Sequence, residues 1–402
     1  MLLINVLLTA SGCVVASIAL YLALLAIAAR FHRESEITAE PLATLAVLIP
    51  AHDEAGLIGH CVESLIDQSY PRDRYSVVVI ADNCSDDTAG IARGAGADLV
   101  LVRDAPDARG KGAALRWAMD RLLTADGPPD AIAVVDADSY VAPDFLEQLA
   151  LPLHAGAQAI QGNYLLEPNR SRGAALRATA FLLVNGVRPA GRAALGMSTF
   201  LVGNGMLFAG ELLRRHPWNA FTSTEDLEYS LELQTAGVRI EFAAQAVVRS
   251  ETAPNPRAAA VQQLRWEGGK TYLLRSRVPR LLRDAARLRR PGLIVTAFDL
   301  ATPPLGLVAG AAIAGSVVAA GLAVSSGSAF VFVPWLVADA AIVSYVVVGL
   351  YAVRAPRWAY RALLGAPVLL LTKPLTLARV LRFRSDSWVR TERASDQAKQ
   401  QA

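Results

Sequence analysis

Residues 130–138 have the sequence DAIAVVDAD, an apolar run that ends in two aspartates spaced two positions apart. A short, continuous apolar run is typical of a strand buried on both faces, as the strands of a parallel sheet are. Three earlier runs have the same character: TLAVLIP (44–50), YSVVVIAD (75–82) and DLVLV (98–102). The segments between the runs have the pattern of helices, at 56–67, 86–95 and 111–124. This alternation predicts an α/β domain with a doubly wound, mostly parallel sheet.

Polar residues follow three of the four predicted strands at the point where each strand ends. They are AHDE (51–54), DNCSDD (82–87) and DADS (136–139). Ligands of doubly wound sheets bind at the carboxyl ends of the strands, so we expect these residues to share one crevice. Asp136 and Asp138 would face the same side of their strand and together reach a hard divalent cation. The sequence therefore predicts Mg²⁺ or Mn²⁺ at this edge, although an Asp-x-Asp taken alone also occurs as a turn or cap.

Composition and missing motifs exclude several classes of function. The net charge of the 402-residue chain is only +3, which gives no reason to expect a nucleic-acid partner. Its three cysteines lie far apart and match neither a disulfide framework nor a zinc site. The glycines around Lys111 do not complete a phosphate loop, and no GxGxxG follows the first strand. The kind of site that is not excluded is one in which carboxylates hold a metal ion beside a phosphorylated ligand.

Part of the chain is predicted to lie in lipid, because 53% of its residues are hydrophobic and only 19% are charged. No charged residue occurs before Arg30, so residues 1–30 are expected to form a retained transmembrane helix. The arginines that follow place the next domain in the cytosol by the positive-inside rule. We therefore expect a multi-pass protein of a bacterial-type inner membrane with a cytosolic catalytic domain.

The C-terminal third predicts further membrane segments. Apolar stretches at 292–323 and 329–353 are expected to span the bilayer. The stretch 362–381 is broken by prolines and a lysine, which favours a re-entrant or interfacial segment and leaves a fourth span as the alternative. Residues 382–402 form a basic tail that would be cytosolic. Residues 256–291 are expected to be interfacial helices, since the apolar positions of 275–290 share one face and seven arginines lie elsewhere.

Six motifs in a fixed order resemble the membrane-embedded family-2 glycosyltransferases over roughly residues 40–270. They are VLIPAHDE (47–54), ADNCSDDT (81–88), RGKG (109–112), DADS (136–139), TED (224–226) and QQLRW (262–266). That group includes chitin-oligosaccharide, hyaluronan and cellulose synthases and many bacterial exopolysaccharide transferases. The chain departs from cellulose synthases, which have a cysteine-containing stretch where this chain has LVGNGMLF (201–208) and which carry more C-terminal spans. The resemblance implies a GT-A fold at 40–255 and an inverting transfer from a nucleotide sugar.

The resemblance also implies roles for individual residues. The nucleotide-sugar site would contain His52, Glu54, Asp82, Lys111, Asp136, Gln262 and Arg265. Asp138, together with Asp136, would hold the metal ion, and the acceptor would meet Gly203, Gly205 and Trp266. Some of these residues also have a plainer interpretation: Asp82 as a turn cap, Lys111 as a helix-start residue, the glycines as a β-bulge and Trp266 as a membrane-interface anchor.

The TED motif supplies the predicted base. Thr224 has the pattern of a helix cap, and Glu225 and Asp226 fall in the first turn. The family pattern makes Asp226 the catalytic base and Glu225 a supporting carboxylate. The alternative is that both acids only complement the helix dipole, an effect of roughly 0.3–1 kcal/mol each.

Three functions follow as hypotheses. The first is extension of a saccharide from a nucleotide sugar, for which we expect UDP as the nucleotide. The second is a single addition to a lipid acceptor, such as a ceramide-like or polyprenyl-linked lipid. The third is a catalytically silent membrane scaffold or sugar sensor. The sequence gives no prediction of the sugar, the linkage, the acceptor or the oligomeric state, because those depend on the shape of the pocket.

Overall fold

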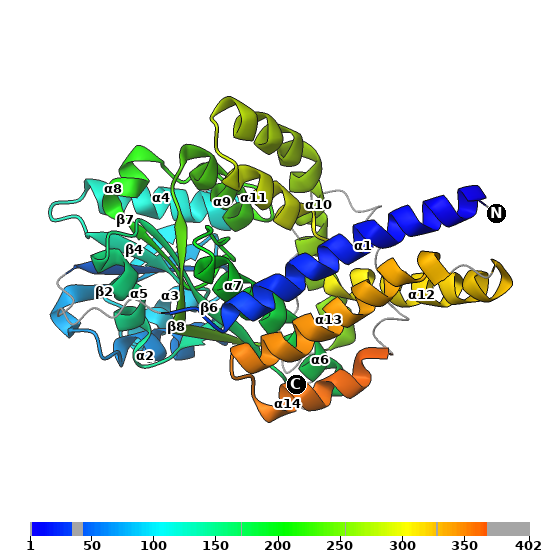
Figure 1. Ribbon diagram of the computed structural model, residues 1–402. Coiled ribbons are helices and arrows are strands. Elements are labelled where there is room, and N and C mark those ends of the chain that lie inside the picture. The colour runs from blue at the N-terminus through cyan, green and yellow to red at the C-terminus, as the bar shows by residue number, and fades with distance from the viewer. Residues whose placement is uncertain (1, 34–42, 170, 254, 327–328, 368–402) are drawn as a thin grey trace. The chain divides into compact units, whose positions relative to one another are not determined.

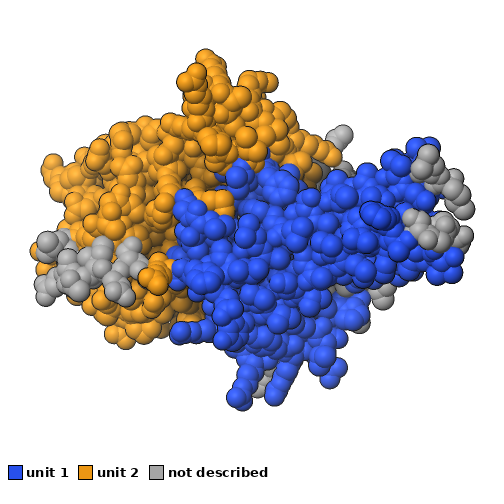
Figure 2. Space-filling view, viewed as in Figure 1, with its two compact units in different colours: residues 1–32, 170–196, 295–383 blue, residues 33–169, 197–294, 384–402 orange. Residues whose placement is uncertain are grey.

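The computed structural model describes residues 2–33, 43–169, 171–253, 255–326 and 329–367 (Figure 1). The chain divides into two compact units, coloured separately in Figure 2. The first comprises residues 1–32, 170–196 and 295–383, and the second comprises residues 33–169, 197–294 and 384–402. The predicted tail at 382–402, and the part of the 362–381 segment beyond residue 367, lie outside the described residues.

An eight-stranded mixed sheet forms the centre of the second unit, in the order β3-β2-β1-β4-β7-β6-β8-β5. Its strands are β1 (Leu45–Ala51), β2 (Tyr75–Asp82), β3 (Leu99–Arg103), β4 (Ala131–Val134), β5 (Ser139–Val141), β6 (Ala159–Glu167), β7 (Met206–Ala209) and β8 (Ile240–Glu251). The four strands predicted from apolar runs are β1 to β4, and they pair in parallel as expected. This part of the prediction is confirmed.

The order of the parallel strands reverses at β1. The chain passes outward from β1 to β2 and β3, then returns to place β4 on the other side of β1. Such a reversal opens a crevice at the carboxyl ends of the two central strands. The polar residues after β1 and after β4 therefore follow neighbouring strands, although Leu48 and Val134, which pair in register, lie 86 residues apart.

The far half of the sheet has mixed pairing that the sequence patterns do not predict. Strand β7 is antiparallel to both β4 and β6, whereas β6 and β8 run parallel with a bulge after Gly162. Strand β5 follows directly after the DADS motif and pairs with β8 at the sheet edge. Both chain segments that lead away from the two aspartates are thus fixed in the sheet.

Helices cover both faces of this sheet (Figure 1). They are α2 (Ile58–Ile66), α3 (Thr88–Gly94), α4 (Lys111–Thr124), α5 (Phe145–His154), α8 (Gly210–Arg215) and α9 (Glu225–Ala236). A buried aromatic cluster of Phe208, Trp218 and Tyr229 packs α9 onto the sheet, with 4.5 Å between the ring centroids of Trp218 and Tyr229. Tyr229 also donates a hydrogen bond to the backbone carbonyl of His216 at 2.6 Å. Because Tyr229 lies one turn beyond the TED motif, this cluster fixes the position of that motif.

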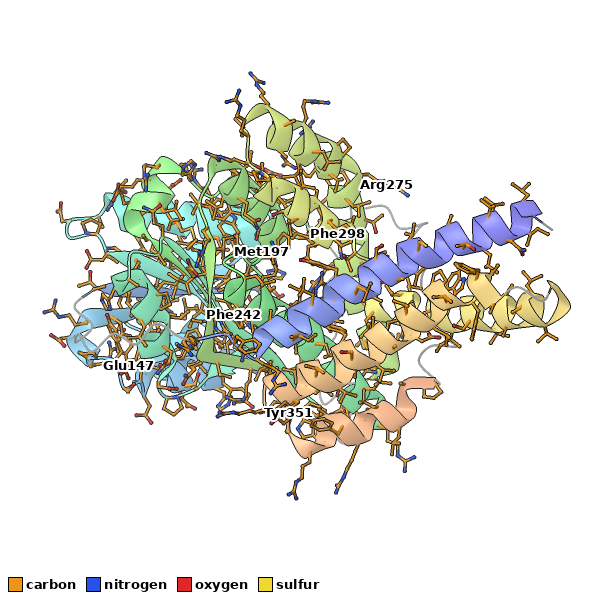
Figure 3. All side chains as sticks on the ribbon, viewed as in Figure 1. Glu147, Met197, Phe242, Arg275, Phe298 and Tyr351 are labelled. Carbon is orange, nitrogen blue, oxygen red and sulfur yellow. The ribbon has the colours of Figure 1, made fainter. Side chains whose placement is uncertain are left out.

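The long helix α10 (Pro256–Arg287) carries the QQLRW motif. The Asn255 side chain caps its first turn by accepting a hydrogen bond from the Ala258 amide at 2.8 Å. Its later half carries the arginines of the predicted interfacial segment, and Arg275 among them is exposed (Figure 3). The single helix replaces the several interfacial helices expected for 256–291.

The described residues of the first unit form helices. They are α1 (Leu2–Ala29), α6 (Arg172–Leu182), the π-helical turn η2 (Leu183–Val187), α7 (Arg188–Ala194), α12 (Leu305–Ser326), the short η3 (Ala329–Val331), α13 (Val333–Ala352), α14 (Arg357–Ala362) and η4 (Leu363–Gly365), with most of α11 (Gly292–Ala301). Three stretches, Leu3–Ala29, Leu305–Val324 and Ala329–Ala352, are long and apolar enough to cross a membrane. The span expected at 292–323 is divided into α11 and α12 because Pro303 and Pro304 lack the amide hydrogens that a continuous helix needs.

Residues 170–196 group with the apolar helices, although the sequence analysis includes them in the catalytic domain. Gly191 on α7 permits this packing, since a Cβ there would lie 2.1 Å from the backbone oxygen of Leu25 on α1. Asp299 on α11 is buried between two guanidinium groups of α7, contacting Arg188 and lying 3.3 Å from Nη1 of Arg192. The arginines of this segment lower its mean hydropathy, so its grouping with the apolar helices was missed; two of them, Arg188 and Arg192, pair with Asp299 within the first unit.

Candidate active site

All the predicted site residues lie in the second unit. Asp136 and Asp138 lie in the turn that follows β4 and are partly exposed, whereas Ala137 between them is buried. Burial raises the pKa of the nearby Cys61 thiol, and the charges of Asp138 and Asp136 raise it further. Both carboxylates therefore lie close enough to Cys61 to affect the pKa of its thiol.

Lys111 joins several of the predicted groups. It is the first residue of α4, and the turn before it needs Gly110, whose φ is +110°. Its Nζ contacts Asp136, donates to the backbone carbonyl of Gly203 at 2.5 Å and lies 4.0 Å from Oε1 of Glu225. Burial alone would lower the pKa of Lys111, but the carboxylates of Asp136 and Glu225 outweigh it and raise that pKa. The charged ammonium therefore links the turn after β4 to the start of α9.

Glu225 and Asp226 begin α9, as the TED motif predicts. Burial raises the pKa of Asp226 to about 7, and the negative charge of Glu225 contributes to the rise. The pKa of Glu225 is also raised, first by burial, while Lys111 and Arg265 oppose the increase. A carboxyl group that titrates near neutral pH is suited to accept a proton from an acceptor hydroxyl.

The two glycines predicted to meet the acceptor differ in their surroundings. Gly203 has φ of +81°, and a Cβ there would lie 3.0 Å from Oδ2 of Asp226, so this residue adjoins the predicted base. Gly205 has φ of +68°, but its Cβ position would face Val248 at 2.7 Å and Phe145 at 3.6 Å. Since Gly205 packs among these side chains, only Gly203 is kept in the acceptor site proposed below.

Asp82 lies at the end of β2 and is buried. Its carboxylate forms an ion pair with the equally buried Arg103, at the end of the adjacent β3, at 2.5 Å. His52 donates from Nδ1 to the backbone carbonyl of Asp82 at 2.8 Å, whereas the Glu54 amide is bound by the Thr88 hydroxyl at 2.9 Å. The loops after β1 and β2 are thereby joined. Arg103 was missed in the sequence, although an arginine that ends an apolar run is itself a signal.

Helix α10 lies directly against the TED motif. A Cβ at Gly269 would lie 2.4 Å from Cγ2 of Thr224, which only a glycine allows. One turn earlier on α10, the positive charge of Arg265 acts on Glu225. One face of α10 thus brings the QQLRW motif to the start of α9. Gln262 shares the face of Arg265 by its i, i+3 spacing, and Trp266 is the next residue along the helix.

The Thr224 hydroxyl does not cap α9, contrary to the sequence pattern. Thr224 occupies the N-cap position without a side-chain cap bond. The hydroxyl groups of Thr222, Ser223 and Thr224 are buried and find no hydrogen-bond partner among the residues that the structure describes. The approach of Gly269 explains the burial of the Ser223 and Thr224 hydroxyl groups.

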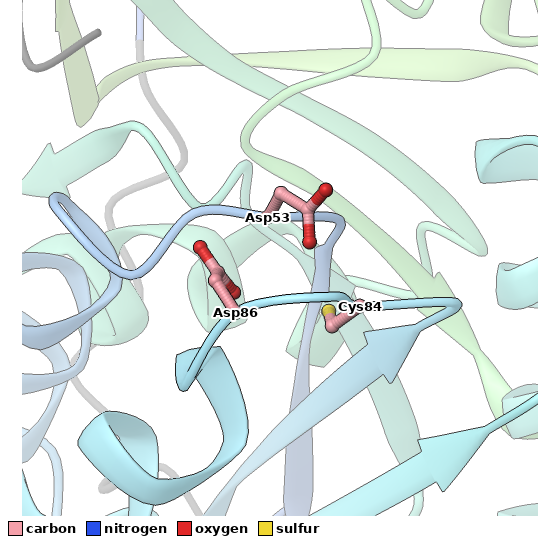
Figure 4. Close-up of side chains that lie close together, drawn as sticks. All are labelled: Asp53, Cys84 and Asp86. Carbon is pink, nitrogen blue, oxygen red and sulfur yellow. The ribbon is translucent and has the colours of Figure 1, made fainter. Parts of the chain in front are cut away.

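A second group of possible metal ligands consists of Asp53, Cys84 and Asp86 (Figure 4). One ligand atom from each lies within 4.8 Å of the others. Their carboxylates already accept backbone hydrogen bonds between the two loops: Asp53 from the Ser85 amide at 2.6 Å, and Asp86 from the Ala55 amide at 3.1 Å. We therefore assign this group a structural role, in which it holds the loops after β1 and β2 together.

Asp136 and Asp138 fit a divalent cation better. Both are carboxylates, the ligands that Mg²⁺ and Mn²⁺ prefer, and two of them leave coordination positions for diphosphate oxygens and water. Their loop also adjoins Lys111, a cation suited to the same diphosphate. The donor chemistry therefore agrees with the predicted metal site.

Comparison with known proteins gives the family. The profile described as glycosyltransferase like family 2 matches residues 41–269, more than half of the chain. The chain belongs to this family. The matched region spans the parallel strands, the TED helix and the first half of α10, including Gly269.

Two curated relatives of this family-2 chain are named for lipid products or substrates. One is 4,4'-diaponeurosporenoate glycosyltransferase of Staphylococcus aureus, 35% identical over 126 residues, which are 30% of this chain and 32% of the relative. The other is β-monoglucosyldiacylglycerol synthase of Synechocystis sp., 28% identical over 243 residues, which are 57% of this chain and 48% of the relative. The chain thus spans between a third and a half of the length of these relatives.

One solved structure resembles nearly the whole family-2 chain. It is the mannosyltransferase PcManGT from Pyrobaculum calidifontis in complex with GDP-Man and Mn²⁺, with a TM-score of 0.53 and 19% identity, covering 87% of this chain and 98% of that chain. At this identity the likeness shows the fold. The predicted GT-A fold with additional apolar helices is confirmed.

Proposed function

We propose that this family-2 chain transfers a sugar from a nucleotide sugar, UDP-linked, to the hydroxyl group of a membrane lipid, with inversion at the anomeric carbon. The observation that carries the proposal is the cluster of Lys111, Asp136, Glu225 and Asp226, in which a carboxyl group of raised pKa lies next to a charged diphosphate-binding group. Three helices long enough to span a membrane and two relatives named for lipids support a lipid acceptor.

The chemistry is a single displacement. Asp226 accepts the proton of the acceptor hydroxyl while that oxygen bonds to the anomeric carbon. The bond from this carbon to the diphosphate oxygen breaks, and its electron pair leaves with the nucleoside diphosphate. Arg265, a planar guanidinium able to bind two phosphate oxygens at once, and Lys111 hold the diphosphate. Gly203 leaves room beside Asp226 for the acceptor.

Asp136 and Asp138 would hold the Mg²⁺ or Mn²⁺ ion. When bound there, the ion supplies positive charge that offsets the charge of the leaving diphosphate. His52 and Glu54 line the proposed nucleotide pocket, and Asp82, held by Arg103, is proposed to recognise the base or the ribose. In the proposed topology the second unit is cytosolic, at the inner membrane of a bacterial-type cell, and Trp266 stacks on the acceptor.

Extension of a saccharide is the second candidate. Its support is the QQLRW helix against the TED motif, an arrangement that brings a flat aromatic residue and the base onto neighbouring elements. The two candidates differ in the product: one sugar on an organic-soluble lipid, or a saccharide of increasing length.

The test uses purified full-length protein in detergent with a panel of radiolabelled nucleotide sugars, Mg²⁺ or Mn²⁺, and a bacterial lipid extract. We expect label in the organic phase as a product with one sugar per lipid. Asp226→Asn should lower turnover by about 10²- to 10⁴-fold and keep nucleotide binding. A polymer in the aqueous phase would select the second candidate, and near-normal turnover of Asp226→Asn would remove this residue from the mechanism.

A further inference from the structure

Asn204 lies in the loop before β7 and is completely buried, with 0% of its surface exposed. Its amide oxygen accepts a hydrogen bond from the backbone N–H of Asp136 at 3.1 Å. Its amide nitrogen donates to the hydroxyl of Ser139 at 2.8 Å. Asp136 and Ser139 are the first and last residues of the DADS turn, which is closed by a backbone hydrogen bond of 3.1 Å between them. One side chain therefore holds both ends of the turn that carries the two carboxylates.

A chain of hydroxyl groups reaches the same turn from the opposite side. Tyr164 on β6 donates to the hydroxyl of Ser250 on β8 at 3.1 Å, and the hydroxyls of Ser250 and Ser139 lie 2.6 Å apart. The Ser139 hydroxyl also lies 3.3 Å from Oδ1 of Asp138, to which it donates. Because the Asn204 amide nitrogen can only donate, the Ser139 oxygen accepts from it and keeps its own proton for another partner.

The directions of these hydrogen bonds are consistent from end to end. The proton of Tyr164 points to Ser250, that of Ser250 can point to Ser139, and that of Ser139 to the carboxylate of Asp138. Each donor polarises the next, so a buried chain of this kind orients its terminal acceptor. The Oδ1 atom of Asp138 is thereby held by the Ser139 hydroxyl.

We propose that Asn204 is a positioning residue for the divalent cation: through its bonds to the Asp136 amide and the Ser139 hydroxyl it sets the DADS turn so that Asp136 and Asp138 face a common ion. This inference rests on the metal-dependent nucleotide-sugar site of the proposed function. Groups that orient metal ligands typically change metal affinity by about 10- to 100-fold when they are removed. Asn204 touches neither the substrate nor the ion and is not a catalytic residue.

The loop that carries Asn204 gives this role further weight. Gly203, the preceding residue, binds Lys111 through its carbonyl and adjoins Asp226. The following residue, Gly205, donates its N–H to the carbonyl of Val134 at the end of β4. Three consecutive residues thus connect the base, the diphosphate-binding lysine and the metal-binding turn.

The experiment measures Mn²⁺ binding to the full-length protein directly, by electron paramagnetic resonance, with UDP and separately with GDP. Asn204→Ala removes both hydrogen bonds to the turn. Ser139→Ala removes the hydroxyl that binds Asn204 and Ser250. We expect each variant to raise the Mn²⁺ dissociation constant by about 10- to 100-fold. The double variant should lose less than the sum of the two single free-energy losses, since both substitutions remove the bond between Asn204 and Ser139.

Asn163→Ala is the matched control. Asn163 is a partly buried asparagine of β6, and its amide donates to the backbone carbonyl of Ala244 at 2.9 Å. It should retain the Mn²⁺ affinity of the unmodified protein. Nucleotide binding without metal should be equal in all variants, and excess Mn²⁺ should restore turnover in Asn204→Ala, whereas a folding defect would not respond to the ion.

Unchanged Mn²⁺ affinity in folded Asn204→Ala would overturn the inference, as would an unmodified protein that binds no Mn²⁺. The proposed function can be refuted independently of this inference. If Mn²⁺ binding depends on Asn204 but no nucleotide sugar is turned over, the positioning role stands and the transferase proposal falls.

Discussion

The Nζ atom of Lys111 lies 4.0 Å from Oε1 of Glu225 while the same ammonium group contacts Asp136. One cation is therefore shared between the turn after β4 and the first residue of the TED helix. The sharing leaves Asp226, the next residue, beside a neighbour that is only partly neutralised. Because the charge of Glu225 raises the pKa of Asp226, the acid limb of the pH profile of kcat/KM should depend on Glu225.

We expect kcat/KM to rise with pH through about 7, because the base must lose its proton before it can accept one and burial with Glu225 raises the pKa of Asp226 to about 7. Glu225→Gln removes the negative charge, so the pKa of Asp226 should fall and the acid limb should move to lower pH. Glu211→Gln, on exposed α8, is the control and should leave the limb in place. A limb that does not move in Glu225→Gln would mean that another group titrates.

Gly203→Ala should lower kcat by about 10²-fold, the effect typical of a misplaced catalytic group. The added methyl would lie 3.0 Å from Oδ2 of Asp226 in a backbone of positive φ. Gly127→Ala is the matched control, since Gly127 also has positive φ, +76°, and no described atom lies within 4 Å of its Cβ position. Both variants should lose similar stability, about 1 kcal/mol, but only Gly203→Ala should lose activity. Equal activity losses would point to backbone strain alone.

Arg277→Gln should weaken the attachment of α10 to the TED helix. Nη2 of Arg277 lies 2.6 Å from Oε1 of Glu228, which is largely buried on α9. We expect kcat/KM to fall about tenfold, equivalent to ~1.4 kcal/mol, and the exchange Arg277→Glu with Glu228→Arg to restore part of it. Arg275→Gln, an exposed arginine on the same helix, should leave steady-state kinetics unchanged. If Arg275→Gln has the same effect, the cause is lost positive charge on α10 and not the ion pair.

Trp266→Ala should raise the KM for the acceptor more than the dissociation constant of the nucleotide. A flat indole ring offers stacking to a sugar, whereas the diphosphate contact is assigned to Arg265. Tyr272→Ala removes an exposed aromatic side chain from the same helix and serves as the control. Parallel losses of acceptor and nucleotide binding would return Trp266 to a structural role.

Asp299→Asn should destabilise the helical unit. The substitution leaves the buried guanidinium groups of Arg188 and Arg192 without the carboxylate between them. Removing one partner from a buried charge network typically costs about 3–5 kcal/mol. Asp339→Asn is the control, since an amide oxygen can still accept the hydrogen bond that Ser316 donates at 2.6 Å. Thermal unfolding in detergent should show a lower midpoint for Asp299→Asn only, and equal midpoints would contradict the network's role.

Much of the fold follows from local patterns. The continuous apolar runs of β1, β2 and β4 predict buried parallel strands, because a strand covered on both faces needs an apolar residue at every position. The run of β3 was expected to be buried as well, but β3 lies at the edge of the sheet and Val102 is 60% exposed. The uncharged first 29 residues predict a membrane helix, because a segment that crosses the lipid core also needs apolar residues along its length. Mixed pairing of β5 to β8 was not predictable, since their registers depend on contacts between residues as far apart as Ser139 and Ser250.

The sequence alone determined which residue types are available for the chemistry and in what order: carboxylates after the strands, a TED helix start and a QQLRW helix. These are local properties of a chain, set by side-chain chemistry and backbone propensity. Only the tertiary structure decided that Asn204 and the Tyr164 chain hold the DADS turn, that Gly203 adjoins Asp226 while Gly205 faces Val248, and that Arg103 pairs with Asp82. The reason is that hydrogen bonds and burial act over a few ångströms in space, and residues 21 to 111 positions apart reach that distance only when the sheet has formed.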